Sequence, residues 1–212
     1  MKRRSGRAKS RKYRGLTAFW KHSYLPAMLT ARHVLTLAAA VAIWACGSGS
    51  SLPTATVENF VDSVQLGAIT GTPLTTPSAF SIPDRQAVRT DRSSAFDFAF
   101  ELVGGQAQLL PLQYLGVGAL TGVNPGLQFT SIPFDSVRSA EKNDYVTDSV
   151  IVIKPGDVLL ARSRLVCTSL SVPQYGKLEI TAIDTVARTV RFRYLVNNNC
   201  GYASLQPGLP RD

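Results

Sequence analysis

The chain has 212 residues, a formal net charge of +9 at pH 7 and a pI of about 9.8, which taken whole favours a nucleic-acid or membrane-surface partner. The first 45 residues hold ten Lys or Arg and no acidic residue, so the 13 basic and 14 acidic residues from Cys46 onward give a net charge of −1. The electrostatic case for nucleic acid is therefore confined to the leader, and we expect no nucleic-acid partner.

Three residue types that carry much of protein chemistry are confined to the same leader. These are both histidines, both methionines and both tryptophans: His22, His33, Met1, Met28, Trp20 and Trp44. Histidine is the usual general base and the commonest metal ligand near neutral pH, so its absence after Cys46 excludes Ser-His-Asp triads and H-E-x-x-H zinc sites there. No nucleophile elbow, P-loop or dinucleotide fingerprint occurs either. We expect no enzyme, no metal site and no cofactor.

Residues 34–45 read VLTLAAAVAIWA, twelve uncharged and mostly apolar residues. A membrane-spanning helix needs about 20 such residues, so the length favours the apolar part of a signal peptide. Cys46 follows, and then GSGSS, a flexible polar stretch. We therefore expect a signal peptide over residues 1–45, with Met28 as an alternative translation start, and a tether over residues 46–55.

The end of this leader resembles the lipobox of bacterial lipoproteins, which runs apolar, small, small, Cys. Ile43, Ala45 and Cys46 match the pattern, whereas Trp44 occupies a position where a small residue is expected. The resemblance implies that Cys46 is lipidated and becomes the first residue of a membrane-anchored envelope protein, on the periplasmic face or in the outer membrane. Two alternatives stay open: a secreted, non-lipidated β protein cleaved near Ala45, and a buried helix with Cys46 as a core thiol.

From residue 56 to 212 the apolar residues recur with period two between Gly, Pro, Asn and Asp, which predicts an all-β domain, either a single β-sandwich or an irregular β-barrel. The first candidate strand covers 56–69. In the second, over 96–102, three phenylalanines and Leu102 alternate with Asp97 and Glu101. We expect the apolar set to face the core and the two carboxylates to face away from it.

Three candidate strands follow, over 127–132, 147–153 and 158–164. The last two are separated by Lys154-Pro155-Gly156-Asp157, and Pro-Gly at the centre favours a type II turn. We expect these two strands to form a hairpin.

A second hairpin is predicted from two alternating stretches, 177–183 and 189–195, around the loop 184–188. If Ile183 pairs with Thr189, the buried pairs are Leu178 with Tyr194, Ile180 with Phe192 and Ala182 with Val190. The outer pairs are Glu179 with Arg193 and Thr181 with Arg191.

With Cys46 assigned to lipid, Cys167 and Cys200 remain as an even pair, which predicts a disulfide in an envelope compartment. The other candidate site is a cationic patch for an anionic ligand, formed by Arg162 and Arg164 on one strand with Arg191 and Arg193 on another. Solvated strand faces paired with Glu179 and other acids are the simpler interpretation of these four arginines.

The domain also resembles the HmuY-like haemophores, which are all-β envelope lipoproteins. The resemblance lies in three short segments: Phe96-Asp97-Phe98-Ala99-Phe100, Tyr145 with Asp148, and Tyr175-Gly176-Lys177-Leu178-Glu179-Ile180. The resemblance implies the all-β fold of that family and a haem held by His or Met side chains. Neither His nor Met occurs after Cys46.

Two hypotheses for the domain follow. The first is a lipid-anchored binding or structural component of the envelope. The alternative is a haemophore-like carrier of a small apolar or aromatic ligand, using tyrosines in place of histidine: Tyr114, Tyr145, Tyr175 or Tyr202.

Overall fold

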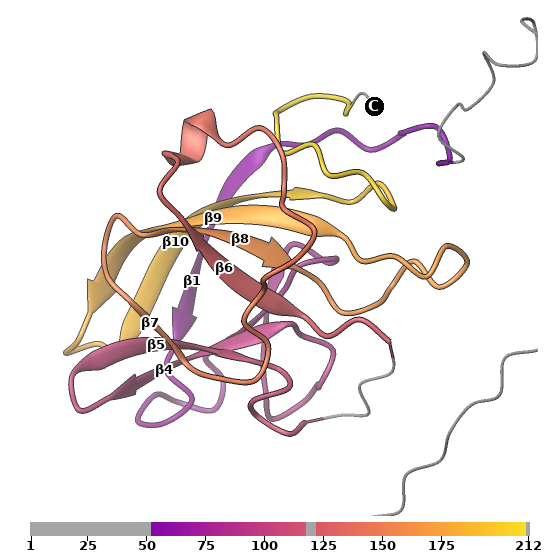
Figure 1. Ribbon diagram of the computed structural model, residues 1–212. Helices are drawn as coiled ribbons and strands as arrows, with labels where there is room; N and C mark the ends of the chain where they lie inside the picture. Colours follow the sequence, from indigo (N-terminus) through magenta and orange to yellow (C-terminus); the bar gives the residue numbers. More distant parts are fainter. Residues whose placement is uncertain (1–51, 118–121, 211–212) are drawn as a thin grey trace, which may run out of the picture. The chain divides into compact units, whose positions relative to one another are not determined.

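The computed structural model describes residues 52–117 and 122–210. The expected signal peptide, the candidate start at Met28, Cys46 and the tether as far as residue 51 lie outside the described residues. In the described part, ten strands and one 3-10 turn, η1 (Phe134–Ser136), make up the domain (Figure 1). No helix among these residues is long and apolar enough to cross a bilayer.

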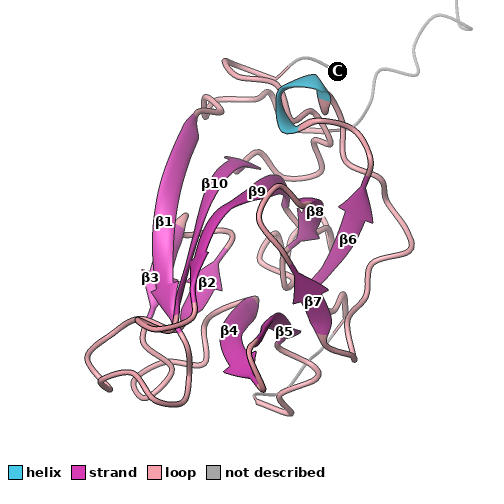
Figure 2. Ribbon diagram, turned by 90° about the vertical axis from the view of Figure 1, so that its left-hand side faces the viewer, coloured by secondary structure: helices cyan, strands magenta, loops and turns pink. Residues whose placement is uncertain are grey.

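The strands form two open antiparallel sheets that pack face to face (Figure 2). The order in the first sheet is β1 (Val61–Gly67), β10 (Thr189–Asn197), β9 (Tyr175–Asp184), β8 (Val158–Arg162), β6 (Gly126–Thr130). The order in the second is β3 (Gln86–Val88), β2 (Ala79–Ser81), β4 (Phe98–Val103), β5 (Gln106–Pro111), β7 (Ile151–Ile153). The all-β prediction is confirmed, and of its two forms the sandwich is the one observed.

Aromatic side chains from both sheets fill the space between them. Phe80 of β2 lies at the centre, with its ring centroid 5.3 Å from that of Phe192 and 4.8 Å from that of Tyr194, both on β10. Phe98 of β4 packs 5.6 Å from Phe80. Edge-to-face contacts of this kind stabilise a core beyond the area that they bury, so this cluster joins the two sheets.

A second cluster lies on the outer face of the first sheet. There Leu160 and Leu195 pack against residues from the segment after β6, among them Phe134 and Tyr145, and against Leu205. The middle strands of this sheet are therefore buried on both faces, and β8 carries buried residues at four consecutive positions.

The strand predicted over 96–102 forms, but its two faces differ from the expectation. Phe98 and Phe100 face the inter-sheet core, whereas Phe96 packs with Ala99 in a separate cluster. Asp97 and Glu101 are only 1% and 7% exposed. The acidic face is therefore covered, and its carboxylates must find partners inside the protein.

The turn at residues 154–157 forms as predicted, with Gly156 at φ +89° and a bond from the Asp157 amide to the Lys154 carbonyl. The predicted hairpin is wrong, because β7 pairs with β5 in the second sheet and β8 pairs with β9 and β6 in the first. The turn therefore carries the chain from one sheet to the other. Alternation alone does not specify which sheet a strand joins.

The β9–β10 hairpin has the predicted register at three positions: Leu178 opposite Tyr194, Glu179 opposite Arg193 and Ile180 opposite Phe192. Towards the loop the prediction is wrong, because a bulge places Ala182 opposite Arg191, Ile183 opposite Val190 and Asp184 opposite Thr189. Thr181 is the extra residue, and its hydroxyl donates to the Arg191 carbonyl at 3.0 Å. The bulge exposes Ala182 and turns Ile183 towards the core.

Candidate functional site

The four arginines proposed as an anionic-ligand patch are engaged separately in the structure. Arg162 donates twice to the Asn124 carbonyl and lies 4.8 Å from the centroid of the Tyr145 ring. Arg191 remains exposed and donates to the Gln65 side chain at 3.0 Å. The structure therefore does not bring the four side chains together.

Arg193 bonds to two carboxylates on the outer face of the first sheet. It pairs with Glu179, as predicted, and also with Asp135 of η1 at 3.0 Å. Its guanidinium lies 4.2 Å from the centroid of the Phe134 ring, and the Lys177 ammonium lies 4.6 Å from the same centroid. Phe134 is thus bordered by two cations, which fixes η1 on the sheet.

Lys177 is 3% exposed and donates to the carbonyl oxygens of Phe134 and Val137 at 2.8 and 2.9 Å. Burial lowers the pKa of this lysine, Asp135 opposes the shift, and Arg193 adds to it. These bonds satisfy carbonyls at the end of η1, so they give the lysine a structural role.

Arg164, two residues after the end of β8, contacts the buried Asp97. The Asp97 carboxylate accepts from the Arg164 backbone amide at 2.6 Å, from Arg164 Nη1 at 3.0 Å and from the Ile82 amide at 2.7 Å. Burial raises the pKa of Asp97, and Arg164 opposes this shift. The carboxylate therefore links the second sheet to the first.

A matching contact at the other end of β4 was not predicted from the sequence. Glu101 accepts from the Thr70 amide and hydroxyl and from Arg188 of the β9–β10 loop, the last at 3.1 Å. Arg188 also donates to the carbonyls of Thr70 and Leu102. The alternation of residues 96–102 marks both acids, but nothing local identifies an arginine that follows 87 residues later.

The four tyrosines considered for a ligand carrier do not converge. Tyr145 and Tyr175 lie 6.4 Å apart between ring centroids in the outer cluster, and burial raises the pKa of both. Tyr114 is 49% exposed, and Tyr202 donates to the Pro53 carbonyl at 2.9 Å. Tyr145 and Tyr175 thus pack together within the hydrophobic cluster on the outer face of the first sheet.

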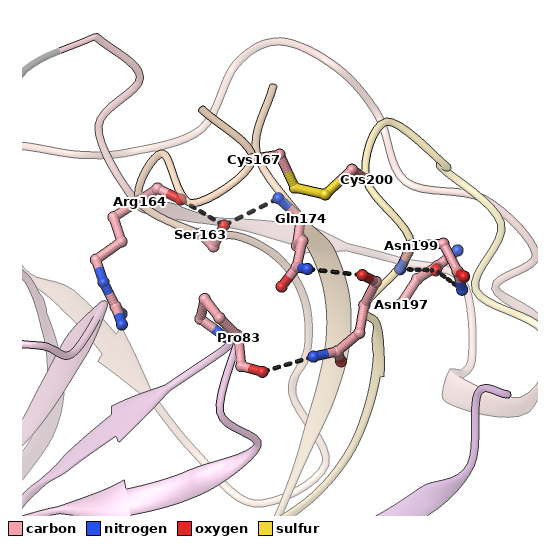
Figure 3. Close-up of a disulfide and its surroundings, with 9 residues drawn as sticks. Pro83, Ser163, Arg164, Cys167, Gln174, Asn197, Asn199 and Cys200 are labelled. Carbon is pink, nitrogen blue, oxygen red and sulfur yellow. Dashed lines mark hydrogen bonds between the residues drawn. A yellow bond between two sulfur atoms is a disulfide. The ribbon is translucent and has the colours of Figure 1, made fainter. Parts of the chain in front are cut away.

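Cys167 and Cys200 form a disulfide with a Cα–Cα distance of 5.8 Å across 33 positions (Figure 3). The bond ties the loop after β8 to the segment after β10, as predicted. Beside it, Gln174 donates to the Asn198 carbonyl, and Asn198 donates to the Pro83 carbonyl. The end of the first sheet is thereby connected to the turn between β2 and β3.

Asn199, between Asn198 and Cys200, holds the first described residues of the domain by hydrogen bonds. Its Oδ1 accepts from the amides of Thr56 and Val57 at 2.8 and 3.0 Å, and its Nδ2 donates to the Val57 carbonyl at 2.7 Å. Leu52 packs against Gly201, where a Cβ would lie 2.5 Å from Leu52 Cδ2 and where φ is +85°. We call residues 52–59, together with residues 197–208 that hold them, the entry junction.

Asn59 completes the junction. Its backbone exchanges two bonds with Gly208, at 2.9 and 2.8 Å, and its Nδ2 donates to the carbonyls of Ser204 and Gln206. The chain is therefore held against the body of the sandwich from the first described residues, directly beside the disulfide.

Open depressions occur at both ends of the sandwich. One of about 350 Å³ borders the entry junction and is lined by Ser204, Gln206, Pro207, Gly208 and Leu209. Another of about 400 Å³ lies between the β4–β5 turn, β7 and the end of β9. Within the described ranges, no three Cys, Asp or Glu side chains lie close enough together to hold a metal ion.

The described residues thus define a disulfide-closed antiparallel β-sandwich whose polar contacts are concentrated at the entry junction and at the two ends of β4. No family model matches this chain, and neither a curated protein nor a solved structure matches it.

Proposed function

We propose that the chain is a lipid-anchored protein of the cell envelope, in which Cys46 carries the anchor and the β-sandwich acts as a binding or structural component. The distribution of its three cysteines carries the proposal. Two of them are bonded to each other, and the third follows the apolar segment of a basic leader.

The disulfide supports an oxidising compartment. Disulfides persist in secreted and periplasmic proteins and are rare in the cytosol, where thiols are kept reduced. Cys167 is 5% exposed and lies beside the entry junction, so the bond is part of the packed domain.

The entry junction supports attachment through the N-terminal side. Only six positions separate Cys46 from Leu52, and the residues from Leu52 onward are held by Gly201, Tyr202 and Asn199. A domain carried on so short a link stays close to its anchor, as a peripheral envelope component requires.

The test is metabolic palmitate labelling of the full chain and of the Cys46→Ser variant, followed by membrane flotation and mass analysis of the mature N-terminus. We expect label and flotation for the wild type and for the control Ser48→Ala, and loss of both for Cys46→Ser. Unlabelled wild-type protein with an N-terminus generated near Ala45 would replace the proposal with a secreted, non-lipidated protein.

A further inference from the structure

We propose that the end of the sandwich at which the chain enters rests on the bilayer through exposed apolar side chains, so that the lipid surface is a direct partner of the folded domain. This inference rests on lipidation of Cys46. The side chains concerned form what we call the entry rim: Val57, Phe60, Val61 and Leu209.

The four side chains of the entry rim are exposed, although their backbone is held by hydrogen bonds to the rest of the domain. Val57, Phe60, Val61 and Leu209 are 39%, 49%, 45% and 50% exposed. In the antiparallel bridge between Asn59 and Gly208, Phe60 and Leu209 lie one position to either side of the bridged pair, so the two residues flank the same bridge. Large apolar side chains that gather at one place on a surface mark a contact site more often than scattered ones do.

The short link between Cys46 and the domain supports the bilayer as the partner of the entry rim. Six residues extend by roughly 20 Å at most, so a lipidated Cys46 cannot lie farther than this from Leu52. Because Asn199 holds Thr56 and Val57 against the sandwich, the rim cannot swing away from the point of attachment. Anchoring therefore keeps the rim within reach of the lipid surface at all times.

The chemistry of the rim fits the interfacial region of a bilayer. Phe and Leu side chains bind where acyl chains meet headgroups, and adjacent cations add attraction to anionic lipids. Arg85 is such a cation, with its guanidinium 4.6 Å from the centroid of the Phe60 ring, but the exposed Glu58 and Asp62 offset its charge, so the apolar side chains carry the contact. The bond from Arg85 to Asn198, near the disulfide, fixes this pair on the domain.

The opposite end of the sandwich offers a matched control surface. Val186 in the β9–β10 loop is 93% exposed and Leu74 is 75% exposed. β1 runs from the entry rim to this end in seven residues, about 23 Å at 3.3 Å per residue (Figure 2). These side chains are at least as apolar and exposed as the rim, but they lie a strand length away from it.

The sequence makes a clean fluorescence test possible, because tryptophan is absent from Cys46 onward. The variants Phe60→Trp, Leu209→Trp and Val186→Trp each place one tryptophan in the processed protein. Purified lipidated protein is reconstituted into phosphatidylcholine–phosphatidylglycerol vesicles with and without brominated acyl chains. We expect at least about twofold quenching and a blue shift at positions 60 and 209, and neither at 186.

Equal emission from all three positions, in protein that floats with the vesicles, would overturn the membrane-facing rim and leave the lipid anchor standing. Protein that carries no acyl chain and does not float would overturn the anchor and the inference together.

Discussion

Arg164 donates to Asp97 from both its backbone amide and its side chain, across 67 positions of the sequence. Asp97 precedes β4 in the second sheet and Arg164 follows β8 in the first, so this contact connects the two halves of the sandwich. The Asp97 side chain is 1% exposed, so its charge is stabilised by these bonds and not by water.

We predict that Asp97→Asn lowers the free energy of unfolding by about 3 kcal/mol at pH 7, because Arg164 then keeps only the half-exposed Asp84, 3.4 Å away, as a counter-charge. Denaturant unfolding gives this value. Asp91→Asn is the control, since Asp91 pairs with Arg89 on the surface, and it should change stability little. Equal effects of the two substitutions would show that the Asp97 contact is not a structural link.

At the entry junction, Asn199→Ala should release the amides of Thr56 and Val57, which lose their shared acceptor. Because Thr56 and Val57 are exposed, water can replace the lost acceptor, and each bond should contribute only about 0.5–1.5 kcal/mol. Hydrogen exchange at these two amides should become faster. Asn198→Ala is the control, because its side chain bonds to Pro83 and Arg85 and not to residues 56 and 57. Unchanged protection in Asn199→Ala would contradict the described junction.

The stability of the domain should fall in alkaline solution. Burial raises the pKa of Tyr194 from 10.0 to about 12, with the Asp62 carboxylate contributing. A folded-state pKa above the unfolded value favours the neutral phenol in the folded protein. This contribution is fully present below pH 10 and is lost between pH 10 and about pH 12.

Tyr194→Phe should therefore show a shallower loss of stability over this pH window. At pH 8 it should be less stable by about 0.5–1.5 kcal/mol, since its hydroxyl donates to the Arg85 carbonyl at 2.7 Å. Urea unfolding between pH 8 and 12 measures both effects. A parallel series with Tyr114→Phe, at an exposed position, should keep the wild-type slope.

In the leader, Trp44→Ala should increase the processed fraction of the chain, because it supplies the small residue that the lipobox pattern requires before Ala45. Pulse-chase labelling would measure the ratio of precursor to mature protein. Trp20→Ala removes the other tryptophan outside the pattern and should leave this ratio unchanged. If both substitutions act alike, Trp44 has no special place in processing.

Local sequence was sufficient to predict the all-β class, the turn at residues 154–157 and the central register of the β9–β10 hairpin. Each depends on residues close together in the chain: period-two alternation, Pro-Gly turn chemistry and facing apolar positions. The disulfide was also predictable, because only two cysteines remain if Cys46 is assigned to lipid.

Tertiary structure decided what alternation could not specify. β7 and β8 enter different sheets, Thr181 becomes a bulge, and Asp97 and Glu101 are buried because arginines from distant segments reach them. Likewise, Asn199 acquires its role only because residues 56 and 57, more than 140 positions away, lie beside it in the fold. From the sequence alone, seven strand segments and the cysteine pair could be predicted, because these depend on local pattern and count, but β2, β3 and β5 were not predicted. The partners of its buried charges and amides were settled only by packing, which brings remote parts of the chain together.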